Sequence, residues 1–341
     1  MLICAQINNG QAKCPILYPI IIDCEKCEFG HAEGYIDYKG NFVGEPKLET
    51  AFEFSDFVGV IRIKGDRSGV VNLQGNLTIF PEGIHPLSSF SEGVAVAVIK
   101  DKEGIIDKAG NPVAIFPFEV ESSDYRPAST NFSDGLAAIG VLGGGLVFVD
   151  KTGKVIINLE SGYRTFSGFK DGMAVIGLKN ADYGVINKTG KFIFGPVDPR
   201  ELSIFAPSDG LVRIGKNLIS PAKYINKEGK VVLEVPYHYA GDFAEGLAHI
   251  KINDKWGYMN KKGEIVIPPQ FESVENFSEG LAAASINGKY GFINKKGEFV
   301  IPPQFGLVNT FKCGLAHVQK DGLGGYIDKT GKWVWKMSSQ K

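Results

Sequence analysis

Cysteine residues gather at the start of this chain, and their spacing raises the question of a metal site. Four of the five cysteines, Cys4, Cys14, Cys24 and Cys27, lie in the first 27 residues, and Cys24-Glu-Lys-Cys27 has zinc-ligand spacing. A structural zinc site usually has two close pairs, and here only one exists. We expect buried or reduced thiols in a divergent N-terminal cap. A zinc site and a disulfide stay as alternatives, although a disulfide would be unexpected in a reducing cytoplasm.

The five histidines form no catalytic arrangement in the sequence. His249 and His317 take the same place in two copies of Gly-Leu-Ala-His, which favours a packing role. No histidine stands with a Ser or Cys in a nucleophile motif, and the sequence contains no Walker loop. We therefore predict a protein that is not an enzyme and that carries no catalytic residue, metal or cofactor.

A short pattern, Asp/Asn-x-x-Gly, recurs through the chain and sets its organisation. The copies are Asp37–Gly40, Asn72–Gly75, Asp107–Gly110, Asp150–Gly153, Asn187–Gly190, Asn226–Gly229, Asn260–Gly263, Asn294–Gly297 and Asp328–Gly331. Successive copies lie 35, 35, 43, 37, 39, 34, 34 and 34 residues apart. Each copy offers one Asx, often a neutral Asn, so calcium binding is disfavoured. The pattern indicates a tandem repeat protein.

The repeat unit has the composition of β-structure. Gly and Pro occur in each unit, and both disfavour a helical repeat of this length. An Asx at the start of a type I turn with Gly at its fourth position is typical of a hairpin. In the seventh unit we expect strands at Tyr258–Asn260 and Glu264–Ile267, the second ending at Pro268-Pro269 because Pro cannot donate to a ladder.

A third strand is expected to precede each hairpin. It begins at a Phe-x-x-Gly-hydrophobic-Ala element, such as Phe243–Ala248, Phe277–Ala282 and Phe311–Ala316. The earliest copy, around Phe54–Val58, has lost its Gly. Each unit is therefore predicted to be a meander of three strands, and pairing of the linker as a fourth strand is the alternative.

The unit resembles the WG-repeat family, also called KWG. Lys255-Trp256-Gly257-Tyr258 matches the family signature, and Lys289-Tyr290-Gly291-Phe292 matches it with a substitution. The similarity extends over about residues 30–335 and is strongest after Asn226. Val147 and Lys223 replace the first Gly of the fourth and sixth copies. The resemblance implies a bacterial binding or scaffold protein without a defined catalytic site.

Two architectures suit such repeats. We predict an all-β fold in which three- to four-stranded antiparallel meanders form a β-propeller-like toroid, with an open β superhelix as the alternative. The expected organisation is an N-terminal cap or closing strand over residues 1–29, one repeat domain of nine units over 30–336, and a polar tail over 337–341. Leu2–Ile7 could supply the strand that closes the ring.

Charge and hydropathy exclude several partners. The net charge is −1, from 37 basic and 38 acidic residues, so nucleic acid is not expected as a partner. No secretory signal is recognisable and no segment is long enough to span a bilayer, so we expect a bacterial cytoplasmic protein without a membrane partner. The lysines beside the turns, such as Lys261, Lys262, Lys295 and Lys296, are interpreted as solvated tips rather than a basic stripe.

Residues that interrupt the repeat are the candidates for binding. Insertions lie around Glu119–Asn131 and Gly195–Ser208, and insertions in repeat proteins often mark the binding face. The candidates for partner contact are Tyr125, Arg126, Arg200, Tyr237, His238 and Tyr239.

Three functions follow as hypotheses. The first is a non-catalytic protein-binding scaffold that acts through its inter-repeat loops. The second is a module for carbohydrate or cell-envelope glycan, using Tyr237, Tyr239, Trp256, Trp333 and Trp335. The third is an enzyme with a site at the opening of the toroid, which rests on analogy of fold alone.

Overall fold

A computed structural model describes residues 18–23, 31–37, 39, 41–48, 50–63, 67–120, 130–159, 161–216, 221–237 and 239–336. The chain divides into two compact units. Unit 1 comprises residues 1–180 and 188–191, and unit 2 comprises residues 181–187 and 192–341. Each unit is described by itself.

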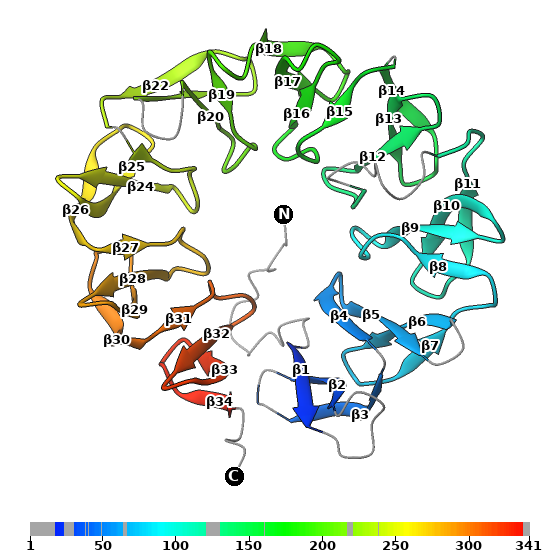
Figure 1. Cartoon of the computed structure of the whole chain (residues 1–341), viewed down its shortest axis with the longest axis horizontal. Helices are drawn as coiled ribbons and strands as arrows, with labels where there is room; N and C mark the ends of the chain where they lie inside the picture. Colours follow the sequence, from blue (N-terminus) through cyan, green and yellow to red (C-terminus); the bar gives the residue numbers. More distant parts are fainter. Residues whose placement is uncertain are drawn as a thin grey trace, which may run out of the picture. The chain divides into compact units, whose positions relative to one another are not determined.

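Every regular element among the described residues of unit 1 is a β-strand (Figure 1). The strands are β1 (Tyr18–Asp23), β2 (His31–Ile36), β3 (Phe42–Leu48), β4 (Thr50–Ser55), β5 (Val58–Ile63), β6 (Arg67–Asn72), β7 (Leu77–Ile79), β8 (Ile84–Pro86), β9 (Val94–Ile99), β10 (Lys102–Asp107), β11 (Pro112–Ile115), β12 (Leu136–Val141), β13 (Gly145–Asp150), β14 (Val155–Leu159), β15 (Arg164–Thr165) and β16 (Met173–Gly177). They form the sheets β1-β2-β3, β4-β5-β6-β7, β11-β10-β9-β8 and β12-β13-β14, and the antiparallel pair β15–β16.

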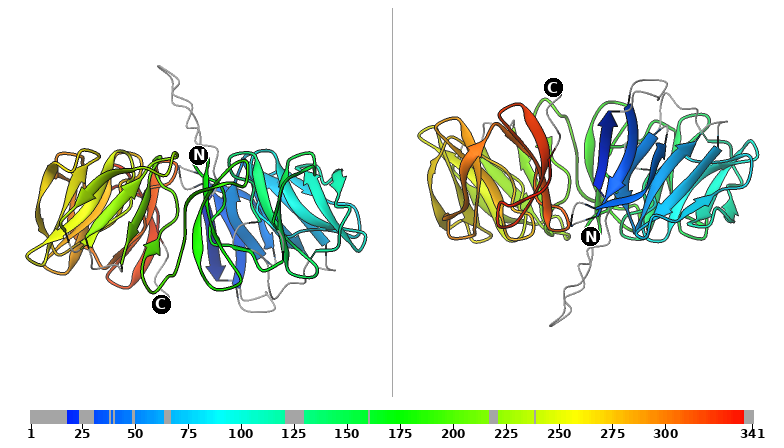
Figure 2. Two further views of the ribbon diagram at one scale, coloured as in Figure 1. Left: turned by 90° about the horizontal axis from the view of Figure 1, so that it is seen from above. Right: turned by 90° about the horizontal axis from the view of Figure 1, so that it is seen from below.

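Unit 2 continues the same arrangement. Its strands are β17 (Tyr183–Asn187), β18 (Phe192–Val197), β19 (Ser203–Ile204), β20 (Val212–Gly215), β21 (Ala222–Ile225), β22 (Val231–Val235), β23 (Tyr239–Ala240), β24 (Leu247–Ile252), β25 (Lys255–Asn260), β26 (Ile265–Phe271), β27 (Ser273–Val274), β28 (Ala282–Ile286), β29 (Lys289–Ile293), β30 (Phe299–Phe305), β31 (Leu307–Val308), β32 (Leu315–Lys320), β33 (Leu323–Asp328) and β34 (Trp333–Lys336). After the pair β17–β18, four sheets follow, each with its four strands in chain order. Within each unit the sheets stand side by side (Figure 2).

The Asx-x-x-Gly turns join the last two strands of each sheet, as predicted. In the turn between β29 and β30, Asn294 Oδ1 accepts the backbone N–H groups of Lys296 at 2.9 Å and Glu298 at 3.1 Å. Gly297 donates its N–H to the carbonyl of Asn294 at 2.9 Å and has a φ of 83°. The Asx side chain therefore organises the turn locally, and Gly supplies the left-handed conformation that closes it.

The linking segment does pair as a fourth strand in most sheets. In the eighth unit, Ser273 and Val274 of β27 pair with Ser285 and Ala284 of β28. In the fourth unit the corresponding contact is a single bridge between Val120 and Val141. The predicted meander is confirmed, and its linker adds the strand next to the Gly-Leu-Ala strand.

The prediction that the last strand ends at Pro268-Pro269 is wrong. β26 runs through both prolines to Phe271 and pairs Trp256 with Phe271 and Tyr258 with Ile267, with a bulge between these pairs. The strand lies at the end of its sheet, where a residue without N–H is tolerated. The bulge absorbs the extra residues, so the prolines shape the strand instead of ending it.

The close approach of the outer strand explains the Gly of the family signature. A Cβ added at Gly257 would lie 2.3 Å from the oxygen of Ile267 and 2.7 Å from the nitrogen of Pro269. The same approach occurs without a bulge at Gly104, where an added Cβ would lie 2.1 Å from the oxygen of Ala114. In the two copies that lack this Gly, Val147 pairs with Asn158 and Lys223 with Glu234. Gly is therefore required where the backbone of the outer strand crosses close above it.

The hydrophobic core of each unit lies between neighbouring sheets. One cluster joins Tyr258 and Phe271 of one sheet to Phe277 and Ala282 of the next. The Phe of each Phe-x-x-Gly element is buried between sheets, and most of them meet an aromatic ring edge-on, as in Tyr258–Phe277 with ring centroids 4.8 Å apart. The Tyr258 hydroxyl also donates to the carbonyl of Glu275 at 2.7 Å, which satisfies the one polar atom of this buried ring.

Each unit is thus an all-β array of antiparallel meanders of the propeller-blade type, which confirms the predicted fold class. The choice between a closed toroid and an open superhelix depends on the placement of the two units and stays a prediction. Leu2–Ile7 and most of the N-terminal cap lie outside the described residues. Among the described residues, no helix is long and apolar enough to cross a membrane.

We expect Gly291→Ala to lower the free energy of unfolding by about 1–3 kcal/mol, because its Cβ would lie 2.3 Å from the oxygen of Ile301. Gly306→Ala is the control, since the nearest atom to its Cβ would be 3.9 Å away. Urea unfolding measures both variants. Equal losses in the two would contradict this account of the Gly.

Candidate functional site

A second set of tight turns brings acidic residues to the boundary between sheets. Each Phe-x-x-Gly element is a two-residue turn whose acidic residue and Gly both have positive φ, for example 55° at Glu92 and 95° at Gly93. Ser91 and Val94 flank this turn and bridge to each other. Two consecutive residues with positive φ are the pattern of a type I′ turn.

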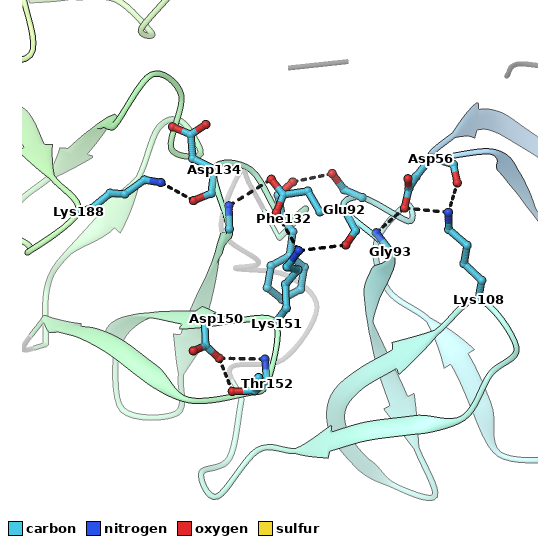
Figure 3. A network of polar contacts seen from close by, with 12 residues as sticks. Asp56, Glu92, Gly93, Lys108, Phe132, Asp134, Asp150, Lys151, Thr152 and Lys188 are labelled. Carbon is cyan, nitrogen blue, oxygen red and sulfur yellow. Dashed lines mark hydrogen bonds and ion pairs between the residues drawn. The ribbon is translucent and has the colours of Figure 1, made fainter. Parts of the chain in front are cut away.

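In six of these turns the acidic side chain binds the next sheet, and Figure 3 shows the contacts of Asp56. Asp56 accepts the N–H of Gly93 at 2.5 Å, and its carboxylate lies 3.1 Å from Lys108 Nζ. Lys108 also donates to the backbone carbonyl of Asp56. One residue therefore binds both a backbone amide and a cation of the neighbouring sheet, and we call this arrangement the inter-sheet clamp.

The clamp recurs along both units. The pairs of acidic residue and lysine are Asp56 with Lys108, Glu92 with Lys151, Asp134 with Lys188, Asp209 with Lys261, Glu245 with Lys295 and Glu279 with Lys329. The lysine is always the residue after the Asx of a hairpin turn. Lys261 and Lys295, interpreted from the sequence as solvated tips, are 44% and 46% exposed, and they also reach backbone carbonyls at 2.6 and 3.0 Å.

The last sheet departs from this rule. Cys313 occupies the place of the acidic residue, with a φ of 51°. It is buried and disulfide-bonded. The cysteines that the sequence offered as zinc ligands, Cys4, Cys14, Cys24 and Cys27, lie outside the described residues.

Unit 2 contains a polar network that breaks the repeat. Arg213 on β20 is only 8% exposed, although the other units place Ala, Val or His at its position. Its Nε donates to Asp242 Oδ1 at 2.9 Å, and its guanidinium lies 3.3 Å from the centre of the Phe205 ring. A buried Arg is tolerated here because a carboxylate and an aromatic face replace its water. Aligning the repeats would have revealed this residue, which the sequence analysis missed.

His249 holds the position of Arg213 in the next sheet. Its Nδ1 lies 3.1 Å from Oδ1 of Asn276, and its ring meets Trp256 edge-on at 5.2 Å. Burial lowers the pKa of His249 from its ordinary value of 6.5, against the smaller opposing effect of Asn276. The packing role predicted for this histidine agrees with these contacts.

An exposed aromatic patch lies beside His249, and it consists of Tyr239, Lys251 and Trp256. Tyr239 is 36% exposed, and its ring centroid lies 6.0 Å from that of Trp256. Lys251 Nζ lies 5.3 Å from the Tyr239 ring and 5.9 Å from the Trp256 ring, and 3.0 Å from Asp254. These contacts hold the rings in a defined arrangement at the surface, which we call the Tyr239 patch.

The other sequence candidates do not join this patch in one cluster. Arg200 is exposed and forms an ion pair with Asp198 at 2.5 Å, which raises its pKa and lowers that of Asp198. Tyr237 packs partly against the core of its sheet. Tyr125, Arg126 and His238 lie outside the described residues.

The start of the first insertion borders a groove. The groove has a volume of about 610 Å³ and is lined by Lys102, Phe116, Phe118 and Glu119, among others. The rings of Phe116 and Phe118 are stacked, with centroids 5.3 Å apart. In the described part of the chain, no three His, Cys, Asp or Glu side chains come together in a way that could hold a metal ion.

Comparison with known protein families agrees with the repeat. The model of the WG containing repeat matches residues 34–64, 224–256, 256–290 and 290–323. The chain therefore contains WG repeats, which confirms the resemblance stated from its sequence. No curated protein matches the sequence of this chain.

Several solved structures are similar in shape. They include the computationally designed Ika8 protein, with 15% identity over 85% of this chain and 97% of that chain and a TM-score of 0.43. BamB from Moraxella catarrhalis has 12% identity over 83% and 95%, with a TM-score of 0.40. Apo AztD from Citrobacter koseri has 14% identity over 80% and 91%, with a TM-score of 0.41. At these TM-scores, no conclusion about this chain rests on the similarities.

The clamp predicts a measurable loss of stability when its acidic residue is removed. Glu279→Ala takes a carboxylate from the N–H of Gly314 at 2.8 Å and from Lys329 at 3.1 Å. Because both side chains are partly exposed, we expect a loss of about 1 kcal/mol in the free energy of unfolding. Lys296→Ala, at the second lysine of a hairpin, is the control and should change little. A double-mutant cycle with Lys329→Ala that gave no coupling would reject the clamp.

Protonation of His249 should destabilise the fold as the pH falls. In the unfolded chain the imidazole takes up its proton near pH 6.5. In the folded chain its pKa is lowered, so it takes up the proton only at a lower pH. The unfolded state then binds more protons, so the free energy of unfolding falls between pH 6.5 and the folded pKa.

Urea unfolding at pH 7.5 and 5.5 tests this dependence. The pH-dependent loss should be smaller in His249→Ala, which installs the residue found at this position in the next repeat. His317→Ala should reduce the loss by less, because burial also lowers the pKa of His317 but its side chain is more exposed. An unchanged pH dependence in His249→Ala would contradict the assignment.

Proposed function

We propose that this chain is a non-catalytic protein-binding scaffold, in which WG-type β repeats present loops and turns to another protein. The Tyr239 patch is the observation that carries this proposal. Tyrosine, tryptophan and cationic side chains are the types that dominate binding energy at protein interfaces. Here they are held together before any partner arrives, so less side-chain entropy is lost on binding.

The surroundings of the patch support the same function. Arg213 bonds Asp242 and His249 bonds Asn276, and each bond joins one sheet to the next. The inter-sheet clamp adds further links between the same sheets, such as Lys261 with Asp209. A surface supported in this way keeps its shape, which favours recognition of one partner geometry.

The same patch is a poor platform for a sugar ring. Carbohydrate recognition would use an open aromatic face, whereas the rings of Tyr239 and Trp256 are tilted by 58° and Lys251 lies over both. Glycan binding by these rings is therefore the lesser expectation.

A bacterial cytoplasmic location is part of the proposal. The disulfide at Cys313 weighs against it, because disulfides persist mainly in oxidising compartments. Alkylation of thiols in freshly lysed cells, with and without reduction, shows whether the protein is in a reducing or an oxidising compartment.

Tyr239→Ala should abolish retention of the partner protein and leave the fold intact, because Tyr239 is the most exposed ring of the patch. Tagged wild-type and variant chains are used to capture proteins from a lysate of the source organism, and the captured proteins are identified by mass spectrometry. One dominant partner lost in Tyr239→Ala supports the proposal.

Leu307→Ala is the matched control. Leu307 holds the position of Tyr239 two repeats later and is 64% exposed, so the variant tests the same place on another sheet. The patch would be rejected as the binding surface if both variants lost the partner protein equally. It would also be rejected if neither the wild-type chain nor Leu307→Ala captured a partner protein. If a glycan array showed binding that depends on Tyr239, the patch would instead be assigned to carbohydrate binding.

A further inference from the structure

One tight turn of unit 1 carries an exposed aromatic residue in a conformation that favours glycine. Asp56 and Phe57 connect β4 to β5 and have φ angles of 49° and 71°. Ser55 and Val58 pair on either side of them, so the connection is a two-residue turn with both φ angles positive. A bulky residue is a rare occupant of this region.

The other repeats show what this position normally requires. The equivalent residue is Gly93, Gly135, Gly172, Gly210, Gly246, Gly280 or Gly314 in the later copies. A Cβ added at any of these seven would meet no atom within 4 Å. The position therefore faces open space, and local structure gives no reason for a large side chain there.

Phe57 makes little use of burial within its own fold. Its side chain is 53% exposed, and Lys108 Nζ lies 5.3 Å from the centroid of its ring. An exposed phenylalanine gains little hydrophobic stabilisation, while the left-handed backbone opposes it. Strain combined with exposure is the pattern of a residue retained for contact with another molecule.

The charges around the turn indicate which kind of molecule. Asp56 is paired with Lys108 and Glu92 with Lys151, with N–O distances of 3.1 and 3.7 Å. Among the described residues, these ion pairs balance the charges at the rim of the turn, which does not favour lipid headgroups or nucleic acid. A single raised ring with a neutral surround fits an apolar pocket on a protein.

We propose that Phe57 is an anchor residue that inserts into an apolar pocket of a partner protein. The inference rests on the proposed function only in taking the partner to be a protein. Phe57 lies in unit 1 and the Tyr239 patch in unit 2, so each contact is tested separately.

The anchor predicts opposite effects of one substitution on stability and on binding. Phe57→Gly restores the residue of the other repeats and should raise Tm by about 1–3 °C, because the strain is removed. Leu77→Ala is the control, since Leu77 lies on β7 of the same sheet and is 52% exposed. A fall in the Tm of Phe57→Gly would show that the ring stabilises the fold and would overturn the proposal.

Photocrosslinking identifies the occupant. p-Benzoylphenylalanine is placed at position 57, and separately at position 77, in cells of the source organism. We expect one protein adduct from position 57 that is absent from position 77. The purified adduct partner should then bind Phe57→Gly at least tenfold more weakly than wild type and Leu77→Ala within twofold of wild type.

The remaining outcomes overturn the inference. These are no adduct specific to position 57, an adduct with a second copy of this chain, and Phe57-dependent association with phosphatidylcholine–phosphatidylglycerol vesicles. A partner protein that binds Phe57→Gly normally but no longer binds Tyr239→Ala would support the scaffold function and would reject only the anchor role of Phe57.

Discussion

The hydrogen bonding between neighbouring sheets is the constraint on which the rest of this structure depends. A single repeat cannot bury its hydrophobic face alone. Here each sheet shares a core with the next, and a carboxylate such as Glu245 binds the amide of Gly280 and the ammonium group of Lys295 across the boundary. The positive φ of the acidic residue and the Gly directs the turn toward that contact. The clamp therefore joins backbone conformation, charge and packing in one repeated element.

Departures from this element are where function is expected. Most repeats obey the same local rules, so a residue that violates them without evident benefit to stability requires another explanation. Arg213 places a permanent charge where other sheets have Ala, Val or His, and Phe57 places a ring where later repeats have Gly. Tyr239 adds an exposed ring beside Trp256. These residues share no repeat position, which is consistent with recognition by an asymmetric partner.

The sequence predicted the elements whose causes are local. Asn294 and Gly297 lie three residues apart and close their own turn, so their types sufficed to locate a hairpin. The Phe-x-x-Gly-hydrophobic-Ala element likewise indicated the strand that follows it, such as β28. Of the candidate site, Tyr239 and His249 were singled out beforehand, but their neighbours Lys251 and Asn276 were not, because no local pattern links them.

What the sequence by itself determined is the repeat, its turns and its β-structure, since hydrogen bonds over two to four residues set them. Only the tertiary structure decided that Lys295 reaches Glu245, 50 residues earlier, and that β26 continues through Pro268 and Pro269. Both depend on how one strand or sheet faces another. Contacts of that kind follow from packing geometry, which the order of residues within one repeat does not contain.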